Sequence, residues 1–231
     1  MDYAKMTIEE LAALVRKNLA LRPSSDTASL NAACGRFKYR SAPNGTIVIT
    51  DPEWTAKNIV SLTTQEYGKR NALKDFVPDL PGWPPTPILR NGKPAFTTVP
   101  KVWCHRLMAP ALVLAWRIVF LENLQSKVAT FDGLWVPRHQ LFNPSRPLSV
   151  HSWGMALDVA ARTNGFGAKP QLDERVAQIF EFYGFAWGGR WRGPRGKNDF
   201  SLADGMHFEY CDPLEYARGP IQDGVLKKDR P

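Results

Sequence analysis

The 231-residue sequence predicts an α+β protein, because helical and strand patterns both recur along it. Apolar residues repeat at helical spacing in three stretches, residues 8–20, 102–127 and 173–183. Short runs that are β-branched or that alternate in polarity predict strands over residues 46–50, 154–159 and 207–210. A chain of this length hides roughly 70–75% of its unfolded surface, so it can form a substantial core.

Two prolines predict where a helix begins or breaks. Asp51 followed by Pro52 is typical of an N-cap and a first helical turn, and it predicts a helix that runs to about Tyr67. Pro110 interrupts the pattern over residues 102–127 and predicts a kink or a split into two helices.

A proline-rich stretch divides the chain. Seven prolines lie between residues 78 and 100, and they predict an extended, irregular connector. Residues 1–77 then form a mainly helical N-terminal region with no assigned role, residues 101–220 form the main domain, and residues 221–231 form a tail. The connector is either a flexible linker or an ordered arm that packs on the main domain.

Composition and charge exclude several classes of protein. Hydrophobic residues make up 44% and charged residues 23% of the chain, which excludes a disordered protein and a membrane channel. The net charge of +8 suits an anionic partner such as nucleic acid, anionic lipid or a bacterial cell wall. Nucleic-acid binding is not expected, because the charge is spread evenly and no motif supports it. The most apolar run, residues 111–121, is too short for membrane insertion.

The three cysteines, Cys34, Cys104 and Cys211, form no CxxC pair and predict no disulfide framework. Residues 1–18 contain acidic side chains and no apolar segment of signal-peptide length. We therefore expect a monomer that is synthesised in the cytoplasm without a signal peptide.

Two short segments carry the chemistry. In LSVHSWGMALDVA, residues 148–160, the small residues Gly154 and Ala156 alternate with apolar ones and lead to Asp158. This pattern predicts a strand whose small-residue face borders open space, with Asp158 at the floor of a cleft and His151 at its entrance. In DGMHFEY, residues 204–210, a second strand begins at His207.

Two histidines and an aspartate can hold a zinc ion and leave the fourth position to water. Asp204 would then be available as a general base for that water. The alternative for such residues is structural: a surface histidine beside a strand and a solvated or paired aspartate.

The same segments resemble the zinc D-alanyl-D-alanine carboxypeptidase and endopeptidase family, peptidase family M15. SVHSWGMALD fits the family pattern SxHxxGxAxD, and DGMHFEY is similar to its second motif. FAWGGRW and FDGLWVPR resemble segments of the phage endolysin branch, the L-alanyl-D-glutamate peptidases. The resemblance covers about residues 102–210, and residues 1–100 have no counterpart in it.

The resemblance implies a fold, a cofactor and a set of residue roles. The fold is a small antiparallel sheet flanked by helices, of the hedgehog/DD-peptidase-like type. One zinc ion per chain would be held by His151, Asp158 and His207. Asp204 would be the catalytic acid/base, Arg138 would orient or polarise the substrate, and Ser149 would lie beside the metal. Arg146 is the alternative to Arg138, because it lies between Arg138 and Ser149.

These expectations describe a zinc metallopeptidase that cleaves bacterial peptidoglycan stem peptides, most like a phage endolysin that reaches the cell wall after release from the host cytoplasm. A D-Ala-D-Ala carboxypeptidase is the alternative enzyme, since the sequence does not decide whether an internal or a terminal bond is cut. A non-catalytic cell-wall-binding or virion structural module is the alternative from another class. A basic, glycine-rich loop is expected to be simply solvated, and the functional alternative is that it faces the acidic stem peptides; its cations are Arg190, Arg192, Arg195 and Lys197.

Overall fold

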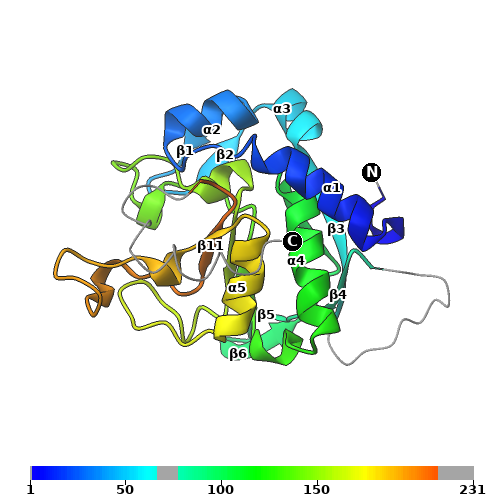
Figure 1. Cartoon of the computed structure of the whole chain (residues 1–231). Helices are drawn as coiled ribbons and strands as arrows, with labels where there is room; N and C mark the ends of the chain where they lie inside the picture. The colour runs from blue at the N-terminus through cyan, green and yellow to red at the C-terminus, as the bar shows by residue number, and fades with distance from the viewer. Residues whose placement is uncertain (1, 67–77, 213–231) are drawn as a thin grey trace.

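The computed structural model describes residues 2–66 and 78–212, which form a mixed α+β fold as predicted (Figure 1). The α-helices of the described residues are α1 (Ile8–Leu19), α2 (Thr27–Cys34), α3 (Pro52–Asn58), α4 (Ala109–Leu121) and α5 (Glu174–Phe182). Their strands are β1 (Tyr39–Ser41), β2 (Ile47–Ile49), β3 (Ile59–Glu66), β4 (Leu80–Trp83), β5 (Thr86–Arg90), β6 (Lys93–Thr97), β7 (Lys101–His105), β8 (Phe131–Gly133), β9 (Ala156–Val159), β10 (Ala186–Trp187) and β11 (His207–Glu209).

Asp158 and His207 lie on a small antiparallel sheet, as expected. Its four strands follow the order β10-β11-β9-β8. In the pairing of β11 with β9, His207 lies opposite Asp158 and Phe208 lies opposite Leu157. Because successive side chains of a strand point to opposite faces, His207 and Asp158 share one face of the sheet and the two apolar side chains share the other.

Helices cover the apolar face of this sheet. The ring centroid of Phe180, in α5, lies 4.8 Å from that of Phe208. Helix α4 packs beside α5 (Figure 1), and its residues 109–116 are all buried, as expected for a helix that is apolar on every side. No helix in the described parts of the chain is long and apolar enough to cross a bilayer.

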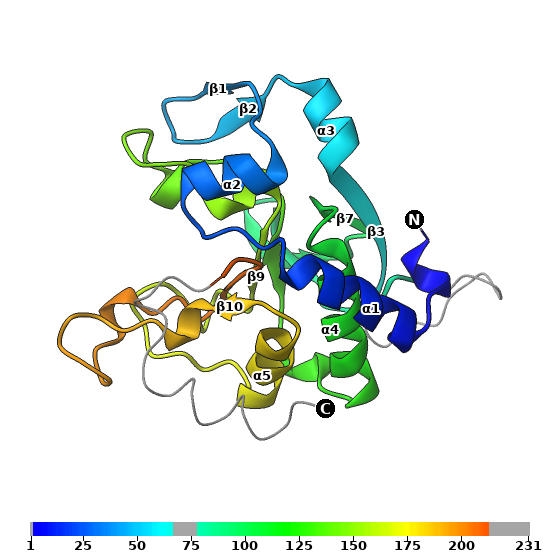
Figure 2. The same cartoon turned by 45° about the horizontal axis from the view of Figure 1, so that its top comes forward.

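The N-terminal region belongs to the same core. Figures 1 and 2 show α1 lying along α4, and the buried side chains of Leu11 and Val15 join the core cluster around α4. The guanidinium of Arg117, in α4, donates to the carbonyls of Tyr3 and Met6 at 2.8 Å each. Strand β3 pairs with β7 in an antiparallel manner, so the first 100 residues and the rest of the chain also share a sheet.

The predicted helix from Pro52 to Tyr67 is wrong beyond Asn58, where α3 ends and β3 begins. The segment from Ile59 onward is rich in β-branched residues, which favour a strand once it can pair on both sides. Strand β3 lies between β4 and β7, and this pairing ends the helix that correctly begins at Pro52. Tyr67 itself lies outside the described residues.

Two further expectations about prolines can be compared with the structure. The pattern over residues 102–127 does split at Pro110, but its first part is strand β7 rather than a helix, and Pro110 lies in the first turn of α4. The stretch over residues 78–100 contains β4 and the β5–β6 hairpin, so it is ordered rather than irregular. The domain boundaries stay a prediction, and the expected tail at residues 221–231 lies outside the described residues.

The expected open space beside β9 is absent from the described structure. Gly154 adopts a left-handed conformation with φ of 69°, and a Cβ built on it would lie 2.9 Å from the backbone nitrogen of His105. Ala156 is fully buried. Gly154 is therefore required by the close approach of the end of strand β7, and no open space borders it.

We predict that a chain beginning at Thr98 does not fold, because the truncation removes core side chains that cover α4. The truncated chain should be insoluble or lack a cooperative melting transition by circular dichroism. A finer test compares two leucines: Leu11→Ala, fully buried, should lower the free energy of unfolding by about 2–5 kcal/mol. Leu21→Ala, which is half exposed, should change it by less than about 0.5 kcal/mol. A soluble fragment with a native-like transition would contradict the prediction.

Candidate metal centre and active site

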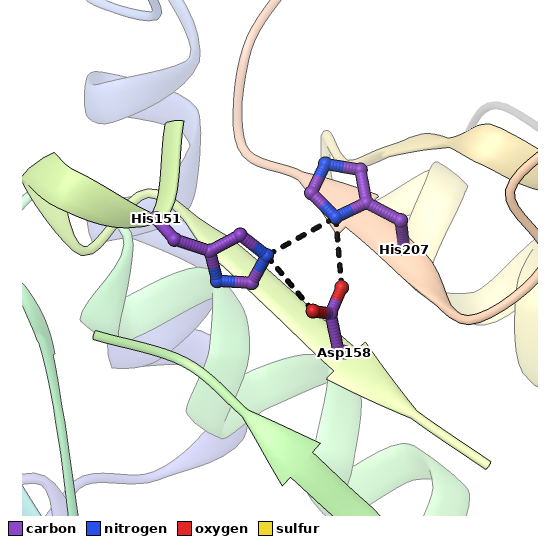
Figure 3. Close-up of side chains that lie close together, drawn as sticks. All are labelled: His151, Asp158 and His207. Atoms are coloured by element: carbon purple, nitrogen blue, oxygen red, sulfur yellow. Dashed lines mark hydrogen bonds and ion pairs between the residues drawn. The ribbon is translucent and has the colours of Figure 1, made fainter. Parts of the chain in front are cut away.

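The side chains of His151, Asp158 and His207 converge on one point (Figure 3). Nε2 of His151 lies 3.1 Å from Oδ2 of Asp158 and 3.2 Å from Nδ1 of His207. Nδ1 of His207 lies 2.8 Å from Oδ1 of Asp158. One ligand atom from each residue therefore lies within 4.8 Å of the other two, as a shared cation requires.

Three local structures bring these side chains together. Asp158 and His207 are direct cross-strand neighbours on β9 and β11, so the sheet register alone places them in contact. His151 lies in the short 3-10 helix η4 (Val150–Trp153), which precedes β9. Gly154 ends η4 in a left-handed turn and directs the chain into β9, so that His151 reaches over the sheet toward Asp158.

Hydrogen bonds to the outer ring nitrogens fix which nitrogen of each histidine faces the centre. Nδ1 of His151 lies 2.7 Å from the carbonyl oxygen of Leu134 and must donate its proton there, which leaves a lone pair on Nε2. Nε2 of His207 lies 3.0 Å from Oε1 of Glu209, a buried carboxylate, which leaves Nδ1 facing the centre. Such outer partners are typical of metal-binding histidines, because they fix the tautomer and the ring orientation.

The electrostatics of the cluster are those of a cation site. Burial would raise the pKa of Asp158, but the attraction of His151 and hydrogen bonds from both histidines hold it well below its usual range. Burial lowers the pKa of His151. Burial would also lower that of His207, but hydrogen bonds to Asp158 and Glu209 raise its pKa to about 10. The second proton of His207 thus supplies positive charge at the point where three lone pairs meet.

This donor set fits zinc. Two imidazole nitrogens and one carboxylate oxygen are ligands that zinc prefers, and three protein ligands leave a position for water or substrate. A metal ion would replace the second proton of His207, so its binding would release a proton.

Asp204 borders the cluster and carries an unpaired oxygen. Its backbone nitrogen donates to the carbonyl of Gly188 at 2.9 Å, and its carbonyl accepts from the backbone nitrogen of His207 at 3.1 Å. A Cβ added at Gly188 would lie 2.5 Å from the Asp204 carbonyl oxygen, so only glycine permits this approach. Oδ1 of Asp204 is buried and has no hydrogen-bond partner among the described residues. Burial, with a further contribution from the negative charge of Asp158, raises the pKa of Asp204 to about 6.

Arg138 also reaches the cluster, and Arg146 is not the residue that does so. Nη2 of Arg138 lies 3.5 Å from Oδ2 of Asp158. Arg146 is exposed, and its carbonyl accepts a hydrogen bond from the ring of His139. Ser149 lies at the start of η4, where its backbone nitrogen donates to the carbonyl of Arg138 at 2.9 Å. Ser149 thus ties Arg138 to the segment that carries His151.

The basic loop has less free charge than the sequence suggests. Arg190 forms ion pairs with Glu174 and Glu181, and Arg195 forms one with Asp199 at 3.1 Å. Two of the four expected cations are therefore neutralised by side chains of the protein itself. These ion pairs weaken the functional alternative, in which the loop attracts acidic peptides.

Sequence reasoning missed Glu209 as a member of the site. Its signal was present, because residues two apart on a strand share a face and Glu209 follows His207 by two positions. His105, expected in a helix, lies in β7, and burial lowers its pKa to about 4. It is buried beside Trp54, with the two ring centroids 6.3 Å apart. The ring of Trp191 lies 5.8 Å from that of His207, at the edge of the site.

We predict that the purified protein binds about one zinc ion per chain, and that His151→Ala and His207→Ala abolish this binding because each removes one ligand. Elemental analysis after gentle purification measures the metal content. His105→Ala is the matched control, because this histidine is equally buried but lies outside the cluster. Retention of zinc by either ligand variant would show that the metal is bound elsewhere.

Comparison with known families supports the same conclusion. The family model described as D-alanyl-D-alanine carboxypeptidase, of the M15 peptidases, matches residues 143–210. This segment contains the three candidate ligands and Asp204, but not Arg138. No curated protein and no solved structure matches the chain. The match supports a peptidase of the M15 family, and the convergence of His151, Asp158 and His207 is consistent with it.

Proposed function

We propose that this protein is a zinc metallopeptidase that cleaves the stem peptides of bacterial peptidoglycan. The observation that carries the proposal is the convergence of His151, Asp158 and His207 beside a carboxylate, Asp204, that has a free buried oxygen. The family match to residues 143–210 supports the same chemistry and the same class of substrate. A structural role for these residues would leave the unpaired oxygen of Asp204 without a purpose.

Zinc, Asp204 and Arg138 would each have a distinct role in peptide hydrolysis. When bound, zinc would act as a Lewis acid that polarises the scissile carbonyl and makes water more acidic. Asp204 would accept a proton from the attacking water at Oδ1 and deliver it to the nitrogen of the leaving amine. Arg138, whose side chain is 15% exposed, would bind either a carboxylate of the substrate or the negative charge that develops on the carbonyl oxygen.

For the finer assignment we propose an L-alanyl-D-glutamate endopeptidase of the phage endolysin type, which acts on the cell wall after release from the host cytoplasm. The resemblance of FAWGGRW and FDGLWVPR to segments of that branch motivates this choice. A D-Ala-D-Ala carboxypeptidase is the second candidate, and the description of the matching family favours it. The two candidates share the metal centre and differ only in which bond of the stem peptide reaches it.

Mass spectrometry of purified stem peptides after incubation with the zinc-loaded protein tests both assignments. An endopeptidase releases L-alanine from the N-terminal side of the glutamate, whereas a carboxypeptidase shortens the peptide by one terminal D-alanine. Intact peptides after long incubation with zinc-loaded protein would favour the non-catalytic cell-wall-binding module.

We predict that kcat/KM rises with pH as Asp204 ionises, because Asp204 must be ionised to accept a proton. Its pKa is about 6 without metal, and the charge of bound zinc would lower it, so the rise should lie at or below about pH 6. Asp204→Asn should keep the zinc and the fold but lose roughly 10²–10⁴-fold in turnover, and it should lose this rise. A pH profile and elemental analysis of both proteins provide the measurements.

The pH dependence of the stability of Asp204→Asn provides a second test of the raised pKa of Asp204. A carboxyl group whose pKa is higher in the folded state than in the unfolded state lowers the free energy of unfolding as pH rises through that interval, here from about 4 to 6. Metal-free Asp204→Asn should therefore be at least as stable as the wild type above pH 6. Asp173→Asn, at the N-cap of α5, is the control for the substitution itself. Loss of zinc from Asp204→Asn would instead make Asp204 a ligand.

A further inference from the structure

The segment that carries Arg138 is attached to the β1–β2 hairpin of the N-terminal region (Figure 2). The backbone nitrogen of Ile47 donates to the carbonyl of Pro137 at 3.1 Å, and that of His139 donates to the carbonyl of Gly45 at 2.8 Å. Thr46 and Arg138 form an antiparallel bridge between these two bonds. The backbone of Arg138 is thus held by a part of the chain that lies outside the family match.

The loop that follows Arg138 has an unfavourable backbone conformation. Leu141 and Phe142 both adopt left-handed φ values of 53°, which cost non-glycine residues about 1–2 kcal/mol each. The ring of His139 fixes the start of this loop, with Nε2 3.0 Å from the hydroxyl of Ser41 and Nδ1 2.6 Å from the carbonyl of Arg146. Strained backbone of this kind persists only where the surrounding contacts enforce it.

This backbone conformation places the side chain of Phe142 in contact with that of Arg138. The guanidinium carbon of Arg138 lies 5.1 Å from the centroid of the Phe142 ring, within the range of a cation–π interaction. The polar partners of the guanidinium are distant: the carbonyl of Val136 lies at 3.4 Å and Asp158 at 3.5 Å. Bonds of this length fix a side chain poorly, so the face of Phe142 is a further constraint on the plane of the guanidinium.

Gly45 is the point at which the β1–β2 hairpin lies against the backbone of Phe142. Its φ is 78°, and a Cβ built there would lie 2.0 Å from the carbonyl oxygen of Phe142. Only glycine allows the turn of the hairpin to lie against this loop. A methyl group at position 45 would displace the Phe142 backbone, although Gly45 belongs to the N-terminal region and touches no candidate ligand.

We propose that Phe142 is a positioning residue for Arg138, and that the β1–β2 hairpin holds Phe142 in place through Gly45. The inference rests on the proposed function, because it assigns to Arg138 the recognition of a negatively charged group of the peptide. It gives the N-terminal region a defined role in the site, which is to orient the arginine rather than to react.

The first experiment is a double-mutant cycle on kcat/KM with stem peptides. Phe142→Ala and Phe142→Leu should each lose roughly 3- to 30-fold, because both remove the aromatic face, whereas Phe142→Tyr should keep the wild-type value. In an Arg138→Ala background, Phe142→Ala should have no further effect, since Phe142 acts only through the arginine. Equal losses in both backgrounds, or a wild-type value for Phe142→Ala, would overturn the proposal.

The second experiment compares two glycines with the same backbone requirement. Gly45→Ala should reproduce the loss seen for Phe142→Ala while keeping full zinc content. Gly92→Ala is the matched control, because Gly92 also lies in a hairpin turn with φ of 73° but a Cβ there would meet no atom within 4 Å. The two variants share the penalty for alanine in a left-handed conformation, so only the contact with Phe142 separates them. Equal kcat/KM for both variants would contradict the role of Gly45.

A third measurement does not depend on turnover. The side-chain Nε–Hε signal of Arg138 in an NMR spectrum of 15N-labelled protein, identified by its loss in Arg138→Lys, should carry a ring-current shift from Phe142. Phe142→Leu and Gly45→Ala should both move this signal, and Gly92→Ala should not. If the wild type cleaves no stem peptide, the proposed function fails, and an unmoved Arg138 signal in Phe142→Leu separately refutes the positioning role.

Discussion

The pairing of β11 with β9 is the constraint on which the rest of the site depends. This register places His207 opposite Asp158 on one face and Phe208 opposite Leu157 on the other. A slip of β11 by one residue would turn His207 to the face that α5 covers, while Asp158 stayed on the other face. The contact of Phe180 with Phe208 opposes such a slip, because it requires the aromatic side chain to face the helix. Packing on the apolar side of the sheet thereby determines the chemistry on the polar side.

The polar side gathers charges that are costly to bury. Asp158, His207 and Glu209 are all buried, and each is paired with at least one of the others. Pairing of this kind offsets the loss of hydration and keeps the ligand atoms in one orientation. Asp204 is the exception, because its Oδ1 lacks a partner among the described residues while its pKa is raised. Burying this carboxylate without a partner costs stability, but it also gives Asp204 a pKa suited to a general base.

Close backbone contacts set the shape of the site around these charges. Gly154 lets η4 turn into β9 against strand β7, and Gly188 lets the backbone of Asp204, just before His207, approach it closely. Gly45 does the same for the loop that carries Phe142. These three glycines belong to segments far apart in the sequence, and one of them precedes the family match entirely. The shape of the centre therefore depends on segments inside and outside the family match, although its ligands come from residues 151–207.

The sequence by itself determined the fold class, the strands that carry Asp158 and His207, and the residue types of a zinc site, because alternation and ligand chemistry are local properties. It also placed α5 almost to the residue, since the apolar periodicity and the acidic first turn agree there. The spacing of Glu209 two positions after His207 also carried the signal of a shared face, whereas the choice of Arg138 over Arg146 rested on the resemblance alone. Only the tertiary structure decided that β3 is a strand, that Gly154 meets the end of β7, and that the hairpin holds Arg138. These outcomes depend on which distant segments pair, and no local pattern encodes that choice.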